Sequence, residues 1–345
     1  SGTLDAELAA MNECMPHYYR ITQGHGQGAE LLMNAEAAFM QGNFSDAQIL
    51  LEQTYSTIAS NGQHNISLCC DFLATRLSLF QEGVTFVKNP EVKRKELLSL
   101  HNMMWLNIFD STYAYYYALI RMPEKIPALF KDHMLSTVSF LSPCRPMMEM
   151  IENQVFLSQK MYAKVIGRSE TLLPVCEKMH YELVSLHVQI QTAAAYAMLG
   201  KHHDARQLLQ KALGHAMPDG FLIPFVENYT YIKDVLSSIN SITPEPFTDR
   251  ILSLGSVYEQ HCLRLSSRNY RPEILNMLNS REAEIAALIT DRLSNREIAE
   301  RLFLSEGTVK QYVNQIYSKL MINGDTRTKR KQLAELISSI NKGLT

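Results

Sequence analysis

Amide and lysine side chains share one face of a helix that the sequence predicts from Ser305 to Leu320. The apolar residues of this stretch recur at the spacing of a single helix face. They are Val309, Val313, Ile316 and Leu320. Gln311 and Asn314 lie on the opposite face, with Lys310 beside them. Because amide side chains can form paired hydrogen bonds with adenine, this face predicts the recognition of base edges in DNA. An ordinary solvated helix face is the alternative.

Three predicted helix starts follow one another here: two precede the helix from Ser305 to Leu320, and the third is the start of that helix. Two of them have the pattern of a capping box, in which a small polar residue is followed three positions later by glutamate. The pairs are Asn279 with Glu282 and Ser294 with Glu297. Ser305 can cap the third helix, and only residues 302–304 lie between the second helix and that cap. Two short helices joined by so tight a turn predict a helix-turn-helix unit.

The same stretch closely resembles the LuxR-type helix-turn-helix domain. The matching motifs are Ser280-Arg281-Glu282-Ala283-Glu284, Leu293-Ser294-Asn295-Arg296-Glu297-Ile298-Ala299, Ser305, Thr308-Val309-Lys310 and Ile316-Tyr317-Ser318-Lys319-Leu320. The resemblance implies a small four-helix domain that binds double-stranded DNA as a homodimer. The DNA-binding residues that it implies are Ser305, Thr308, Lys310, Gln311, Asn314 and Lys319. Lys310, Gln311 and Asn314 would read bases, whereas Lys319, at the far end of the helix, would meet a phosphate.

The sequence departs from the family pattern at a few positions. Arg292 stands where the family usually has a turn glycine, and Tyr312 replaces a common histidine. Met321 replaces a glycine after the recognition helix, and residues 323–331 form a longer connection to the expected fourth helix.

Charge is distributed unevenly along the 345 residues. Residues 280–345 hold 11 Lys and Arg against 8 Asp and Glu, whereas the rest of the chain holds 22 against 27. A basic end on an acidic body suits nucleic-acid binding. No apolar run reaches the roughly 18 residues that a membrane span needs, and no signal peptide opens the chain.

The cysteines predict a reducing, cytoplasmic environment and no metal site. They are Cys14, Cys69, Cys70, Cys144, Cys176 and Cys262. None forms a CxxC pair, so we interpret all of them as buried thiols. His202 and His203 lie in a predicted turn and form no pair with a carboxylate or cysteine at metal-ligand spacing, so no metal or other cofactor is predicted.

The body of the chain predicts a helical-repeat solenoid. Ala, Leu, Met, Gln and Glu recur at helical spacing, and alternating β-branched runs are absent. Residues 38–51 and 196–209 resemble each other, each with a glycine, Gly42 or Gly200, that can end the first helix of a pair. Weaker turns fall at residues 79–83, 121–123 and 159–163. The resulting period of about 40 residues predicts an all-α array of tetratricopeptide-like helix pairs.

The domain boundaries follow from a polar, proline-containing stretch. A last solenoid helix is expected from Phe247 to about Leu265. We predict a helical-repeat sensor or interaction domain over residues 1–265, a linker over 266–273, and the LuxR-type domain over 274–345.

Repeats ahead of a LuxR-type domain resemble the large regulators typified by the maltose-operon activator. In that family an ATPase domain precedes the repeats. The glycines at residues 24–28 lack the lysine and hydroxyl of a P-loop. Ser1-Gly2 resembles a cloning remnant, so we expect either that such an ATPase has been removed or that the chain is a shortened member.

An effector site on the solenoid is a further hypothesis. An aromatic stripe could line an effector groove or could be core between repeats. Its members are Trp105, Phe109, Tyr113, Tyr116 and Tyr117. The resemblance implies that the solenoid binds a small inducer or a partner protein.

The sequence therefore predicts a DNA-binding transcriptional regulator whose solenoid controls a LuxR-type domain. No catalytic constellation is evident, so an enzyme is not predicted. The alternative is an interaction scaffold whose C-terminal helices only pack or dimerise.

Overall fold

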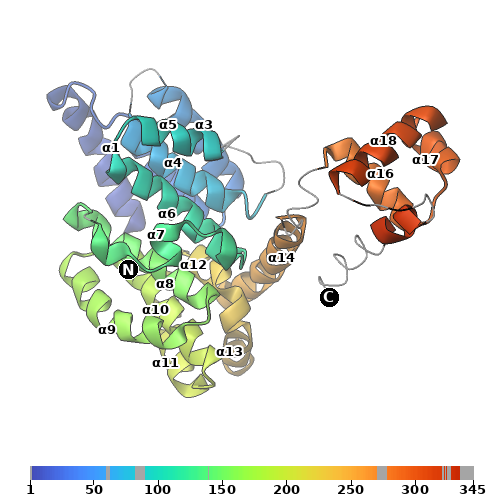
Figure 1. Ribbon diagram of the computed structural model, residues 1–345. Helices are drawn as coiled ribbons and strands as arrows, with labels where there is room; N and C mark the ends of the chain where they lie inside the picture. Colours follow the sequence, from blue (N-terminus) through green and yellow to red (C-terminus); the bar gives the residue numbers. More distant parts are fainter. Residues whose placement is uncertain are drawn as a thin grey trace. The chain divides into compact units, whose positions relative to one another are not determined.

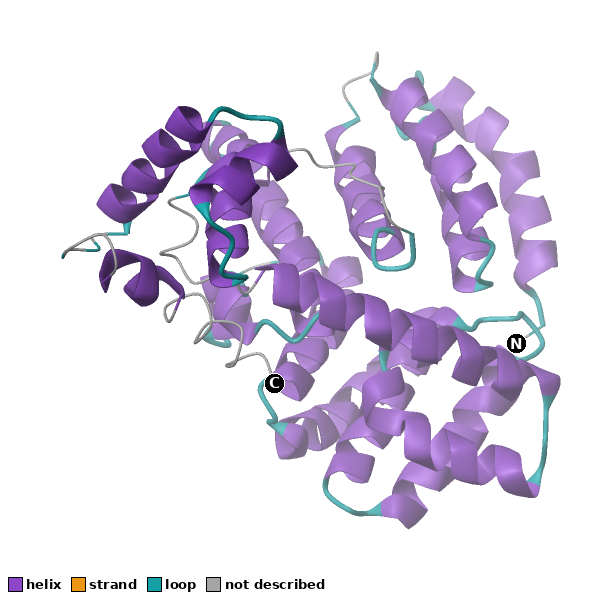
Figure 2. Cartoon of the chain, turned by 90° about the vertical axis from the view of Figure 1, so that its right-hand side faces the viewer, coloured by secondary structure: helices purple, strands orange, loops and turns teal. Residues whose placement is uncertain are grey.

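The computed structural model describes residues 2–59, 63–81, 90–138, 140–269, 278–320, 322, 324 and 328–334. Over these residues the chain is built of helices, turns and loops, without a β-strand, which confirms the predicted all-α class (Figure 2). The chain divides into two compact units, Ser1–Leu263 and Arg264–Thr345.

The first unit is a succession of helices that packs mainly neighbour on neighbour (Figure 1). Its helices are α1 (Leu4–Ile21), α2 (Ala29–Met40), α3 (Phe44–Ile58), α4 (His64–Leu77), α5 (Pro90–Ser99), α6 (Met103–Leu119), α7 (Ala128–Lys131), α8 (Arg145–Ser158), α9 (Tyr162–Lys178), α10 (Glu182–Met198), α11 (His202–Ala216), α12 (Ile223–Glu227) and α13 (Tyr229–Ile242). A further helix, α14 (Pro246–Asn269), begins in this unit and ends beyond its last residue, Leu263. Short 3₁₀ turns lie at Pro123–Lys125, Leu135–Thr137 and Ser142–Cys144.

Helix pairs form at the predicted repeats. α2 packs on α3 and α10 packs on α11. Gly42 and Gly200 end the first helix of each pair with φ of 78° and 75°, the left-handed conformation expected of a helix-ending glycine. Ala47 and Ala205 are fully buried in the second helix, where a small side chain allows the helices to approach closely. Of the weaker predicted turns, Lys160 lies between α8 and α9 with φ of 61°, and Gly83 lies outside the described residues.

The first helices also contact a loop far along the chain. The Leu222 N–H donates to the Met40 carbonyl at 2.8 Å, and the Gln41 side chain donates to the Asp219 carbonyl at 3.1 Å. Ile223 joins the core formed by α2, α3 and α4. The segments near residue 40 and near residue 220 therefore pack against each other, although they are about 180 positions apart.

α14 extends further than the sequence indicated. It continues to Asn269, so the first four residues of the predicted linker, 266–269, are helical. Residues 270–273 lie outside the described residues. The linker and the exact domain boundaries remain predictions.

The second unit packs its helices around a small apolar core. The elements are α16 (Ser280–Thr290), α17 (Asn295–Leu302), α18 (Glu306–Lys319) and a helical segment over residues 328–334. Ile285, Ile298, Val309 and Ile316 are fully buried there, and Leu333 joins them from the last segment. The predicted four-helix arrangement is confirmed, but residues 328–331, which we expected in the connection to the fourth helix, already belong to the helical segment.

The prediction that all cysteines are buried is wrong for half of them. Cys70, Cys176 and Cys262 are buried, but Cys14 and Cys69 are exposed and Cys144 is half-buried. Cys14 lies on α1, in which every residue keeps some solvent exposure. Cys69 is exposed although its neighbour Cys70 is buried, because successive residues of a helix point about 100° apart. Within the described part of the chain, no helix has the length and apolar character of a membrane span.

Candidate nucleic-acid interface

Two complete capping boxes start the helices of this interface. At α16 the Glu282 N–H donates to the Asn279 side-chain oxygen at 2.9 Å, and the Asn279 N–H donates to the Glu282 carboxylate at 2.7 Å. At α17 the Glu297 N–H donates to the Ser294 hydroxyl at 3.3 Å, and the Ser294 N–H donates to Glu297 at 2.7 Å. Each box satisfies backbone donors that a helix start leaves unpaired. Both predicted boxes are confirmed.

The turn between α17 and α18 is tight. Phe303 adopts a left-handed conformation with φ of 56°, and the Leu304 N–H returns to the Ala299 carbonyl at 2.9 Å. The Arg281 guanidinium of α16 donates to the Leu302 carbonyl at 2.8 Å and so holds the end of α17. This geometry fixes the direction in which α18 leaves the turn.

Ser305 and Thr308 shape the start of α18. The Thr308 N–H donates to the Ser305 hydroxyl at 3.1 Å, and the two hydroxyls lie 2.8 Å apart. Ser305 is exposed and Thr308 is half-buried. Both residues therefore fix the helix start, and contacts from them to DNA stay predictions.

α18 separates its apolar and polar faces as the spacing predicted. Val309, Val313, Ile316 and Leu320 are buried, at 0 to 6% exposure. Tyr317 is buried beside them, and burial raises the pKa of its phenol. In contrast, the residues expected to read bases are exposed. They are Lys310, Gln311 and Asn314.

Lys319 has an intramolecular partner that the sequence did not reveal. Its Nζ donates to the Glu282 carboxylate at 2.7 Å, and Glu282 is 1% exposed. Burial opposes ionisation of Glu282, but hydrogen bonds from Lys319 and from the Asn279 N–H lower its pKa below the ordinary value. Lys319 therefore joins the end of α18 to the capping box of α16. Its predicted phosphate contact stays a prediction.

Arg330 ties the last helical segment to the start of α17. Its guanidinium donates to the Asn295 side chain at 2.9 Å and also to the Leu293 carbonyl. In the sequence Arg330 belongs to a basic run, which would suggest DNA rather than an intramolecular partner. No spacing rule connects residues 35 positions apart, so this contact could not be predicted.

The aromatic stripe of α6 divides into different environments. Phe109 is buried in a cluster with Leu68, Leu97 and Leu106, a placement that agrees with the core interpretation of this residue, and its proposed contact with an effector stays a prediction. Tyr113, Tyr116 and Tyr117 are half-buried and contact one another, with ring centroids of neighbouring pairs 5.4 to 6.2 Å apart. Burial raises the pKa of Tyr116 to about 12. Trp105 packs against the same cluster as Phe109 and also lines a groove that is open to solvent.

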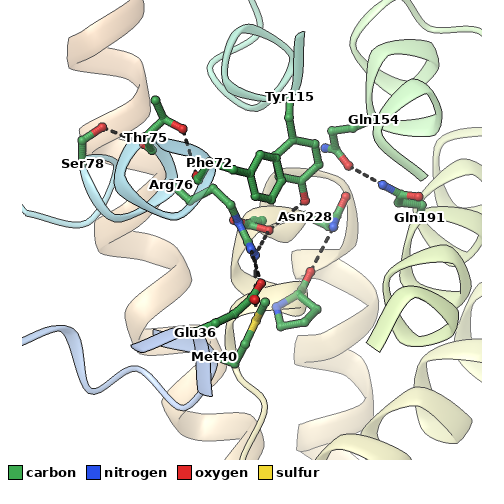
Figure 3. Close-up of polar contacts among 12 residues, drawn as sticks. Glu36, Met40, Phe72, Thr75, Arg76, Ser78, Tyr115, Gln154, Gln191 and Asn228 are labelled. Carbon is green, nitrogen blue, oxygen red and sulfur yellow. Dashed lines mark hydrogen bonds and ion pairs between the residues drawn. The ribbon is translucent and has the colours of Figure 1, made fainter. Parts of the chain in front are cut away.

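A buried ionic cluster lies inside the first unit, and no sequence pattern predicted it (Figure 3). Arg76 of α4 donates to the Glu227 carboxylate of α12 at 2.8 and 3.1 Å. The Tyr115 hydroxyl of α6 donates to the same carboxylate at 2.8 Å. The guanidinium carbon lies 4.9 Å from the ring centre of Phe39, and Glu36 lies 3.7 Å from the guanidinium. The cluster joins helices that are distant in sequence.

Capped helices, a tight turn and an exposed polar face over a buried stripe define a helix-turn-helix DNA-binding domain. Residues 276–330 match the family described as "Bacterial regulatory proteins, luxR family". This end of the chain is a LuxR-type helix-turn-helix domain.

Named relatives match over part of the chain. Identity to the transcriptional regulatory protein LnrK of Bacillus subtilis (strain 168) is 33% over 110 residues, covering 31% of this chain and 49% of LnrK. Identity to DegU of Brevibacillus brevis is 45% over 53 residues, covering 15% of this chain and 22% of DegU. Identity to DesR of Bacillus subtilis (strain 168) is 36% over 75 residues, covering 19% of this chain and 38% of DesR. The chain thus spans less than half the length of each of these relatives. No solved structure matches the chain.

Proposed function

We propose that this protein is a DNA-binding transcriptional regulator in which the helical-repeat unit receives a signal and controls the LuxR-type domain. Double-stranded DNA is the partner of α18, and a homodimer is the binding form. The relatives named above are transcriptional regulatory proteins, which supports the same class of function.

One observation carries the proposal. Lys310, Gln311 and Asn314 are exposed on α18, whereas the apolar stripe behind them is buried in the domain core. Neutral amides can read base edges, and a lysine can contact either a base or a phosphate. In the alternative, an interaction scaffold, the C-terminal helices would use this face for packing. The exposure of all three side chains favours DNA binding.

The test begins with genomic footprinting of the full-length protein, which supplies a cognate duplex. Affinity for cognate and scrambled duplexes is then measured across a salt series. Gln311→Ala and Asn314→Ala should each weaken cognate binding by about 1–3 kcal/mol with little change in salt dependence, because the lost groups are uncharged.

Gln207→Ala provides the matched control, since it removes an exposed amide from α11, outside the LuxR-type domain. It should leave both affinities unchanged. An unaltered ratio of cognate to scrambled affinity in Gln311→Ala and Asn314→Ala would show that this face does not read bases.

The role of the repeats rests on a resemblance. We propose that they bind a small effector or a partner protein, as the resemblance to the large regulators typified by the maltose-operon activator implies. The packed helix pairs of the first unit support this, because stacked pairs present extended surfaces for binding.

A further inference from the structure

A solvent-open groove of about 530 Å³ lies in the first unit, among α1, the loop after it, α4 and α6. Small-molecule sites in proteins commonly have volumes of about 300–1,000 Å³. The lining residues that matter here are Met15, Tyr18, Gln63, His64, Asn65 and Trp105. They come from positions as far apart as 15 and 105, so the groove exists only in the folded unit.

The aromatic wall of the groove is held in place by its own contacts. The Trp105 indole N–H donates to the Asn65 side chain at 2.7 Å. The Trp105 ring also lies against the His64 imidazole, with centroids 4.7 Å apart and planes inclined by 33°. The Trp105 backbone N–H donates to Asn102, which caps α6. With its polar atom satisfied, the half-buried indole offers a fixed flat surface for stacking.

The loop between α1 and α2 is fixed as well. The Gln63 amide accepts from the Gly26 N–H and donates to the Gly24 carbonyl, each at 3.2 Å. A hydrogen bond between Tyr19 and Glu30 fastens α1 to α2. Tyr18 and Met15 of α1 therefore line a groove in which hydrogen bonds also hold the loop after α1 and the Trp105 side chain in place.

The chemistry of the lining selects against charge. Among the described residues that line the groove there is no Asp, Glu, Lys or Arg. A charged ligand would therefore find no Lys, Arg, Asp or Glu partner there, and the ionisable groups of the lining are the imidazoles of His25 and His64. Aromatic, thioether and amide groups suit a flat apolar ring that carries few polar atoms.

We propose that this groove binds a small, uncharged, planar aromatic molecule, stacked against Trp105 and contacted by Tyr18 and His64. The site differs from the predicted aromatic stripe, with which it shares Trp105 alone. The ligand would be the effector of the regulator described above, and only that last step rests on the proposed function.

The chain reports on its own groove, because Trp105 is its single tryptophan. The probe is N-phenyl-1-naphthylamine, an uncharged fused aromatic that accepts energy from tryptophan. Titrated into the full chain, it should quench Trp105 emission in a saturable, single-site manner. Its counterpart 1-anilinonaphthalene-8-sulfonate has the same rings with an added anionic group. It should bind about tenfold more weakly, or worse, because no Lys or Arg among the described lining residues can pair with its charge.

Variants locate the binding. Tyr18→Ala and His64→Ala keep Trp105 and should each raise the dissociation constant of the uncharged probe by about three- to tenfold. Tyr162→Ala on α9 and His202→Ala on α11 remove the same side-chain types elsewhere in the unit and should change nothing.

The proposal is overturned if no saturable quenching appears up to the solubility limit of the probe. It is equally overturned if the sulfonate binds as tightly as the uncharged probe, or if both groove variants bind like the wild type. These results are independent of DNA affinity. A failed titration beside sequence-selective DNA binding would remove the groove and leave the proposed function standing.

Discussion

Lys319 has two possible partners, a buried carboxylate and a DNA phosphate. Its ammonium group already lies 2.7 Å from Glu282, which has 1% exposure and belongs to the α16 capping box. Lys319→Ala should therefore destabilise the contact between α16 and α18 by about 1–3 kcal/mol, a value reduced because the lysine is partly exposed. Hydrogen exchange of α16 and α18 in the full chain measures this local stability.

Arg296→Ala is the control, because the Arg296–Glu300 pair on α17 is solvent-exposed on both sides. Its effect should stay below about 0.5 kcal/mol. Unchanged hydrogen exchange in Lys319→Ala would mean that the Lys319–Glu282 ion pair does not stabilise the contact between α16 and α18. The predicted phosphate contact has its own readout, a decrease of about one unit per protomer in the salt slope of DNA binding.

His187 makes the stability of the first unit depend on pH. It is 2% exposed on α10, and burial lowers its pKa well below the ordinary value, with the charge of Arg76 lowering it further. The unfolded chain therefore binds a proton at His187 more readily than the folded chain does. Stability should be complete above about pH 7 and should fall by up to about 1.4 kcal/mol per pH unit below pH 6.5.

The measurement is urea unfolding of the full chain between pH 7.5 and 5.5, followed by Trp105 fluorescence. His187→Gln cannot titrate and should flatten this slope, whatever it does to stability at pH 7. An equal slope in the variant would assign the pH dependence to other groups, of which the partly exposed His133 is one.

At the scale of elements, the turn between α16 and α17 contains an unfavourable residue. Arg292 is exposed and has φ of 65°, where the LuxR-type pattern has glycine. A side chain in this conformation costs about 1–3 kcal/mol relative to an unstrained residue. Arg292→Gly should therefore stabilise this end of the chain by about 1 kcal/mol. Slower hydrogen exchange in α16 and α17 would show it.

Arg296→Gly is the matched control for that change, because it places glycine inside α17 and should destabilise by about 1 kcal/mol. Faster exchange in Arg292→Gly would contradict the assignment of strain to this turn.

The helices of the LuxR-type domain could be predicted because their caps and apolar stripe are patterns of neighbouring residues. The caps at Asn279, Ser294 and Ser305 act over three residues, so the sequence displays them directly. The buried stripe of α18 repeats with the helix and is equally visible. The end of α14 was missed because the stretch from 266 to 269 is polar and continues the helix without an apolar pattern.

At the scale of the whole molecule, the Arg76–Glu227 pair fastens α4 to α12 across the first unit. The two side chains are 3% and 0% exposed. Glu227→Leu alone leaves a buried guanidinium and should cost about 3–5 kcal/mol. Arg76→Met combined with Glu227→Leu removes both charges and should cost less than Glu227→Leu alone. Urea unfolding followed by Trp105 fluorescence compares the variants.

Arg76→Met is also measured alone. If the loss of unfolding free energy in the double variant equals the sum of the losses in Arg76→Met and Glu227→Leu, the two charges are not coupled. Glu36→Gln is the control, because its carboxylate is partly exposed and lies 3.7 Å from Arg76. Its effect should be small beside that of Glu227→Leu.

Contacts of this kind mark the limit of what the sequence could predict. The repeat period and the glycine turns indicate helix pairs, but the spacing of charged residues does not say which pairs meet. Arg76 and Glu227 are 151 positions apart, and Trp105 meets Asn65 across 40. The groove and the ionic cluster therefore became visible only in the folded chain, whereas the DNA-reading face is contained within one helix.

The same 151-residue separation sets an order of events during synthesis. A ribosome adds about 5–20 residues per second, so Glu227 follows Arg76 by about 8–30 s. During that interval α2 and α4 have been synthesised but α12 has not. The aromatic rings of Phe39 and Phe72, which contact Arg76, then lack the packing that α12 provides. In the LuxR-type domain the Lys319–Glu282 contact spans 37 positions, so the corresponding interval is only about 2–7 s. The first helices of the nascent chain therefore remain incompletely packed for many seconds. During this interval they expose apolar surface that chaperones could bind.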